Sequence, residues 1–120
     1  MAGRLTTHVL NIAQGQPAAG VEITLWRLER NGSGRQLLKT VCTNADGRTD
    51  APLLPGEDLT EGIYELVFAV GAYFAAHAPA SEVLPFLDLV PVRFCIADPT
   101  VHYHVPLLVS PWAYSTYRGS

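Results

Sequence analysis

Two histidines, His102 and His104, lie two residues apart near the end of this 120-residue chain. They belong to an apolar run from Val101 to Val109, and the period of two along a strand places both imidazoles on one face. Imidazoles in such a pair are suited to binding zinc or copper, or to moving protons as general acid and base. Because only Asp98 lies near enough to extend a ligand set, we predict no metal and no cofactor, and a structural role at an interface stays open.

A third histidine, His8, lies in the first expected strand, Arg4 to Asn11. Strand alternation places Leu5 and Val9 on one face and His8 on the other, which in a sandwich is the outer face. His8 alone is compatible with a simple surface or packed residue. An outward face that carries His8 and His104 among apolar residues favours a binding cleft or a subunit interface.

Arg48 and the chain end are two further candidates. Arg48 follows the tight turn Asp46-Gly47, where arginine is ordinarily a solvated residue. The terminal segment Tyr117-Arg118-Gly119-Ser120 would ordinarily be a frayed end. The nearby aromatic residues Trp112 and Tyr114 provide more anchorage than a disordered tail requires.

The elements that must position these residues are short apolar segments separated by nine prolines and ten glycines. This spacing predicts an all-β sandwich of seven to eight strands in one domain, residues 1–120. One short alanine-rich helix is expected at 71–78, as a connector between strands. The expected strands are 4–11, 21–28, 36–43, 63–68, 89–96, 101–109 and 113–117.

Composition limits the possible partners. The net charge is −3 and the eight basic residues are scattered, which argues against nucleic acid or an anionic membrane as a partner. No secretory signal or apolar run of about 20 residues is present, so a cytoplasmic protein is expected. Only 16% of the residues are charged, against about 25% in an average chain, which points to burial of apolar surface between subunits.

Cys42 and Cys95 are the only cysteines, and neither belongs to a Cys-x-x-Cys pair. Their apolar neighbours Val41 and Phe94 favour buried free thiols on strands. A disulfide between them stays open at this level.

The chain resembles the transthyretin-like 5-hydroxyisourate hydrolases over its whole length. The resemblance rests on four blocks and is strongest at the C-terminal tetrapeptide, while Asn11 departs from the aspartate usual in that family. The blocks are Leu5-Thr6-Thr7-His8-Val9-Leu10-Asn11, Asp46-Gly47-Arg48, His102-Tyr103-His104-Val105-Pro106-Leu107-Leu108 and Ser115-Thr116-Tyr117-Arg118-Gly119-Ser120.

The resemblance implies a transthyretin-like (prealbumin-like) sandwich and the ring opening of 5-hydroxyisourate by water in urate degradation, to 2-oxo-4-hydroxy-4-carboxy-5-ureidoimidazoline. It implies that His8, Arg48 and His104 are catalytic, without a metal, and that Tyr117, Arg118, Gly119 and Ser120 bind the substrate. His102 is then the weaker member of the pair. The resemblance also implies a homotetramer with its sites at the contact between dimers.

Two other functions compete with this interpretation. A carrier of small aromatic or heterocyclic ligands on the same sandwich, as in transthyretin, would not require the set of His8, Arg48 and His104. A metal-binding or structural interaction module would use His102 and His104 instead.

Overall fold

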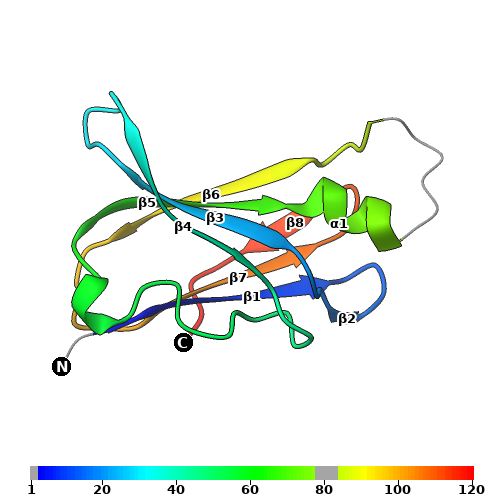
Figure 1. Ribbon diagram of the computed structural model, residues 1–120, viewed down its shortest axis with the longest axis horizontal. Helices are drawn as coiled ribbons and strands as arrows, with labels where there is room; N and C mark the ends of the chain where they lie inside the picture. Colours follow the sequence, from blue (N-terminus) through cyan, green and yellow to red (C-terminus); the bar gives the residue numbers. More distant parts are fainter. Residues whose placement is uncertain (1–2, 78–83) are drawn as a thin grey trace.

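The computed structural model describes residues 3–77 and 84–120, and its described part contains eight strands, one α-helix and one short 3-10 helix (Figure 1). The strands are β1 (Leu5–Asn11), β2 (Gln16–Pro17), β3 (Glu22–Leu28), β4 (Arg35–Cys42), β5 (Gly62–Ala69), β6 (Leu89–Ile96), β7 (Tyr103–Val109) and β8 (Tyr114–Thr116). The helix α1 is Val70–His77, and the 3-10 turn η1 is Gly56–Asp58.

The strands form two four-stranded sheets that face one another. One has the order β2-β1-β7-β8 and the other the order β4-β3-β5-β6. Figure 1 shows the two layers, with α1 at one end of the sandwich. The predicted all-β sandwich is confirmed, and β2 is the strand that the sequence did not predict. Its two residues pair only with the end of β1, so they are too short to show any periodicity.

The core lies between the inner faces of the two sheets. Along β1 the buried and half-buried positions alternate strictly, as the period of two predicts. The two sheets together contribute a large set of side chains with no exposed surface, among them Leu5, Val9, Ile23, Leu25, Leu66, Phe68 and Leu107. Burying one such side chain stabilises the fold by about 1.5–3 kcal/mol, so this shared core holds the sheets together.

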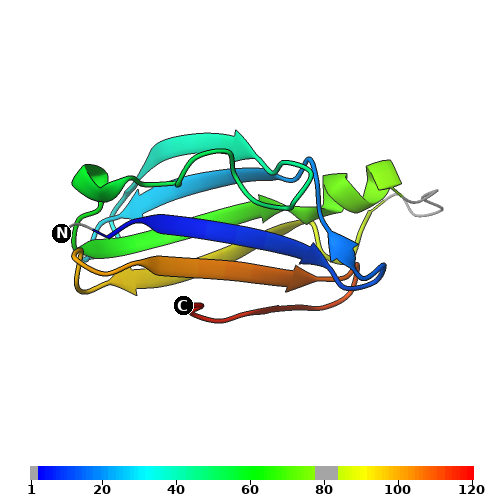
Figure 2. The same ribbon diagram turned by 90° about the horizontal axis from the view of Figure 1, so that it is seen from below.

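The central pair of the first sheet joins the two ends of the chain. β1 and β7 run parallel over their full length, with Thr6 opposite His104 and His8 opposite Pro106. Figure 2 shows these two strands side by side, with the C-terminal segment following the outer edge of β7. Residues almost a hundred positions apart in sequence are therefore neighbours on the outer face of this sheet.

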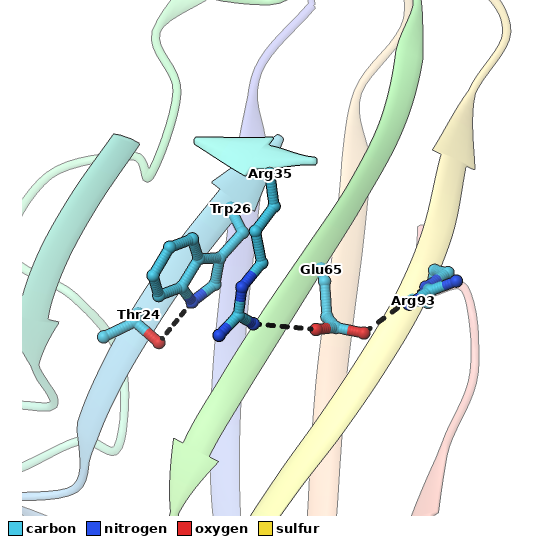
Figure 3. Close-up of polar contacts among 5 residues, drawn as sticks. All are labelled: Thr24, Trp26, Arg35, Glu65 and Arg93. Carbon is cyan, nitrogen blue, oxygen red and sulfur yellow. Dashed lines mark hydrogen bonds and ion pairs between the residues drawn. The ribbon is translucent and has the colours of Figure 1, made fainter. Parts of the chain in front are cut away.

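The outer face of the second sheet carries a polar cluster (Figure 3). The Glu65 carboxylate is 11% exposed and lies between Arg93, at 3.4 Å, and Arg35, at 3.8 Å. The Arg35 guanidinium also lies 4.0 Å from the centre of the Trp26 ring, whose indole N–H donates to Thr24. This cluster belongs to the sheet that does not carry the histidines.

The expectation of buried cysteines is wrong. Cys42 and Cys95 are both exposed and both free. They lie in β4 and β6, the two edge strands of one sheet, and their neighbours Val41 and Phe94 pack against the core, so strand alternation turns both thiols outward. Three strand spacings separate these edges, or roughly 14 Å. Because a disulfide needs Cα atoms within about 7 Å, the two thiols of one chain do not pair.

The remaining expectations concern the helix and the membrane. The helix begins one residue earlier than predicted, at Val70, and the last predicted residue, Ala78, lies outside the described residues. Among residues 3–77 and 84–120, no helix has the length and apolar character needed to span a membrane.

Candidate active site

His8 and His104 lie on the outer face of the β1–β7 pair. Each alternates with buried residues of its own strand and is itself half-buried. Both side chains therefore point away from the core, as strand alternation predicted. The parallel register aligns the two segments, and the sequence, which placed both histidines on an outward face, had not indicated that register.

The turn that carries Arg48 packs directly against β1. The carbonyl of Gly47 accepts a hydrogen bond from the N–H of Val9 at 2.8 Å. Gly47 has φ of +74°, and a Cβ at this position would lie 2.4 Å from the Val9 carbonyl oxygen. Only glycine allows both the backbone conformation and the close approach.

Three further hydrogen bonds fix this turn. The Asn44 side-chain oxygen accepts from the N–H groups of Asp46, at 2.9 Å, and Arg48, at 3.2 Å. Nε2 of His8 lies 2.9 Å from the Asp46 carbonyl oxygen. Because a carbonyl can only accept, Nε2 carries the proton of neutral His8 and Nδ1 keeps its lone pair. His8 thus anchors the turn that holds the exposed Arg48 beside the histidines.

The C-terminal segment folds back onto His104. β8 pairs with β7, and the Thr116 hydroxyl donates to the Pro106 carbonyl at 2.7 Å. Further along, the N–H of Gly119 donates to the His104 carbonyl at 2.7 Å. A Cβ on Gly119 would lie 2.6 Å from Cδ2 of the imidazole, so the tail backbone packs against the ring itself.

Thr6 holds the His104 ring at its Nδ1 nitrogen. Nδ1 lies 2.8 Å from the Thr6 hydroxyl oxygen. No group within residues 3–77 and 84–120 forms a hydrogen bond with Nε2. Burial lowers the pKa of His104 below its usual value of 6.5, and the charge of Arg48, together with that of His8 when it is protonated, lowers that pKa further. His104 is therefore neutral at neutral pH, with Nε2 free for chemistry.

Some of the predicted site residues point elsewhere. The Arg118 guanidinium lies 4.3 Å from the centre of the Tyr103 ring and donates to the His102 carbonyl at 3.2 Å. Tyr103 belongs to the inner-face set of β7, so Arg118 is directed away from the His104 ring. Tyr117 and Ser120 are exposed beside the site.

His102 is separate from the histidine site. It lies just before β7 begins, is exposed, and contributes its backbone carbonyl to the contact with Arg118. In the described part of the chain, no three His, Cys, Asp or Glu side chains are grouped as metal ligands.

Sequence reasoning missed Thr6 and Asn44, which support the site. Thr6 was visible as an outward residue of the first strand, but its partner His104 is set by the parallel register. Asn44 precedes the Asp46-Gly47 turn, where asparagine commonly bonds to backbone N–H groups two residues on.

The assembled groups suit hydrolysis of a polar acyl compound. A neutral imidazole with a free nitrogen is a general base, and it typically contributes about 10²- to 10⁴-fold in rate. A guanidinium offers a planar set of donors to carbonyl oxygens and to a developing oxyanion. On this face the charge of Arg48 acts on His104, and the chain end packs against one side of the imidazole.

Comparison with known proteins places the chain in a family. Residues 5–119 match the HIUase/Transthyretin family. A 5-hydroxyisourate hydrolase of Mesorhizobium japonicum is 59% identical, over 98% of this chain and 93% of that protein.

Solved structures of related proteins support the same family. An (S)-allantoin synthase superimposes with a TM-score of 0.89 and 47% identity over 99% of this chain, which spans only 44% of that longer protein. Transthyretin from Sparus aurata superimposes with a TM-score of 0.84 and 26% identity, over 97% of this chain and 96% of that one. The resemblance inferred from the sequence blocks is confirmed, and the chain belongs to the HIUase/Transthyretin family.

Proposed function

We propose that this protein is a 5-hydroxyisourate hydrolase, which opens the six-membered ring of its substrate with water. The observation that carries the proposal is the His104 imidazole, neutral and with a free Nε2, held beside Arg48 and against the C-terminal tail. The high identity to a full-length relative of that name supports the same substrate.

In this mechanism His104 is the general base. Nε2 takes a proton from water while the water oxygen attacks the acyl carbon and forms the new C–O bond. The proton then passes from the imidazolium to the leaving ring nitrogen as the C–N bond breaks. No other reactant is consumed. The lowered pKa keeps His104 unprotonated, and so ready to accept the proton, at neutral pH.

Arg48 binds and stabilises the reacting carbonyl, while His8 holds the Arg48 turn and orients the water. The Arg48 guanidinium holds ring oxygens and offsets the negative charge of the tetrahedral intermediate, an effect whose loss typically costs about 10²- to 10³-fold in kcat. His8 fixes the Arg48 turn through Nε2–H and offers Nδ1 as an acceptor toward the water or substrate. These assignments give each histidine a different role.

The terminal segment closes the pocket. Gly119 packs against the His104 ring and leaves no room for a side chain there. Tyr117 and Ser120 flank this contact and are the tail residues available to the substrate. Arg118 contributes by holding the tail to Tyr103 and the His102 carbonyl. Substrate contact by its guanidinium would require that arrangement to change.

The test is turnover of freshly generated 5-hydroxyisourate, followed by ultraviolet absorbance. The purified protein should accelerate ring opening far beyond buffer, while His104→Asn and Arg48→Ala lower turnover by orders of magnitude without unfolding. A rate equal to that in buffer would disprove the function. Wild-type turnover in either variant would remove that residue from the mechanism.

The same assay separates the competing functions. A carrier on this fold would bind purine-like ligands without accelerating hydrolysis. A module using His102 and His104 would retain zinc or copper when purified without a histidine tag, as elemental analysis would show.

We also propose that four copies assemble, with sites at the contact between dimers. Trp112, Tyr114 and Tyr117 are 67%, 45% and 59% exposed along the terminal segment beside the site, which is unusual for a solvated surface. Light scattering at micromolar concentration should give about four times the 13.0 kDa of one chain, and a monomer would refute the assembly. The expected cytoplasmic location stays a prediction.

A further inference from the structure

Thr6 contacts the reactive histidine but has no role in the mechanism above. It lies opposite His104 in the parallel β1–β7 pair, and its hydroxyl oxygen is 2.8 Å from Nδ1. Both residues are half-buried, so water competes less for this contact than it would at an open surface. The distance is that of a well-formed hydrogen bond.

A threonine hydroxyl is able to donate or to accept, but the proposed chemistry selects one direction. A general base needs its lone pair on Nε2, which places the proton of neutral His104 on Nδ1. After His104 has taken a second proton, both ring nitrogens are donors. In both states the Thr6 oxygen accepts from Nδ1–H, so the hydrogen bond persists throughout proton transfer.

The surroundings keep the ring neutral and restrain it. The positive charge of Arg48 acts on His104 and disfavours the imidazolium. Gly119 packs against the ring at Cδ2 and restrains rotation of the imidazole. The ring is therefore held at Nδ1 and Cδ2, while Nε2 has no hydrogen-bond partner among residues 3–77 and 84–120.

We infer that Thr6 is a positioning residue: its hydroxyl accepts a hydrogen bond from Nδ1–H of His104 and thereby keeps the Nε2 lone pair directed at the water. The consequence for turnover rests on the proposed hydrolysis, whereas the orientation of the ring does not. Because threonine is uncharged, it sets this orientation without the pKa increase that a carboxylate at this position would cause.

Three variants test the inference. Thr6→Val removes the hydroxyl at nearly constant volume and should lower kcat about 2- to 12-fold, the range expected for one neutral hydrogen bond, with a smaller change in KM. Thr6→Ser keeps the hydroxyl and should restore most of the rate. Thr7→Val is the matched control, because the Thr7 hydroxyl donates to the Val105 carbonyl on the inner face. It should lower the melting temperature without a comparable loss of kcat.

Nitrogen-15 NMR of the imidazoles supplies a readout that a purely structural role would not change. At neutral pH His104 should show a protonated Nδ1 and an unprotonated Nε2, and Thr6→Val should shift protonation toward Nε2, while Thr7→Val leaves it unchanged. A protonated Nε2 in the wild type, or unchanged kcat and spectra in Thr6→Val, would overturn the inference. If the wild type does not hydrolyse 5-hydroxyisourate, the proposed function fails, but the spectra still decide the role of Thr6.

Discussion

Replacing Gly119 by alanine adds one methyl group at the point where the tail meets the His104 imidazole. That methyl carbon would lie 2.6 Å from Cδ2 of His104, whereas ordinary van der Waals contacts begin at 3.4 Å. Gly119 is not among the glycines with positive φ, so alanine suits its backbone and the contact alone is at issue. The tail and the ring must therefore separate by about 0.8 Å.

A displacement of this size is large for catalysis. Misplacing a reacting group by about 1 Å typically costs about 10²-fold in rate, which corresponds to about 2.7 kcal/mol of transition-state stabilisation. We therefore expect Gly119→Ala to lower kcat/KM for 5-hydroxyisourate about 100-fold. The free energy of unfolding should change by less than about 1 kcal/mol, because the residue is half-buried in an otherwise exposed terminal segment.

Gly34→Ala is the matched control for this variant. Gly34 is exposed, its φ is not positive, and the nearest atom to an added Cβ is 3.9 Å away. It should keep wild-type kcat/KM in the same absorbance assay, and circular dichroism should show both variants folded. Wild-type kcat/KM in Gly119→Ala would refute the packing of the tail on the imidazole.

Other consequences concern charge, pH and the tail. Because the pKa of His104 is lowered, kcat/KM of the wild type should fall with decreasing pH only below 6.5. Arg48→Ala removes the nearby positive charge and should move this fall to higher pH, whereas Arg48→Lys keeps the charge and should not. Identical pH profiles for the wild type and Arg48→Ala would contradict the charge effect. The contribution of His104 to the free energy of unfolding should be complete above pH 6.5 and should decline below that pH, because the unfolded chain then binds a proton more readily than the folded one. Urea unfolding at several pH values measures this change. A free energy of unfolding that does not decline would argue against the burial of His104. Deleting residues 117–120 should abolish turnover and leave the circular dichroism spectrum intact, and activity in the truncated protein would exclude the tail from the site. Glu65→Gln should keep full turnover and cost at most about 1 kcal/mol, because its partners Arg35 and Arg93 are 53% and 64% exposed; a large loss of activity would mean that the two sheets are coupled.

Local alternation in the sequence predicted much of the fold. The strict period of two along β1 placed His8 opposite the Leu5 and Val9 face, and the burial pattern agrees. The seven longer strands and the helix were all expected within a few residues of their bounds. This succeeds because side-chain direction in a strand depends on the strand alone.

Properties that depend on a residue's neighbours were harder to predict. The cysteines were expected to be buried because their sequence neighbours Val41 and Phe94 are apolar, but these neighbours pack against the core and strand alternation turns both thiols outward. An apolar neighbour in a strand therefore does not imply burial, which depends on the face of the strand that the core covers. The two-residue β2 is too short to give a pattern.

The candidate site shows the same division. The sequence by itself determined that His8 and His104 point outward, that glycine precedes Arg48 in a tight turn, and that the terminal tetrapeptide matches a family of hydrolases. Only the tertiary structure decided that Thr6 holds Nδ1 of His104, because a parallel pair can adopt any register that the core permits. Likewise, only the path of the tail past β7 brought the Gly119 backbone against the imidazole, since that contact depends on where two distant segments meet.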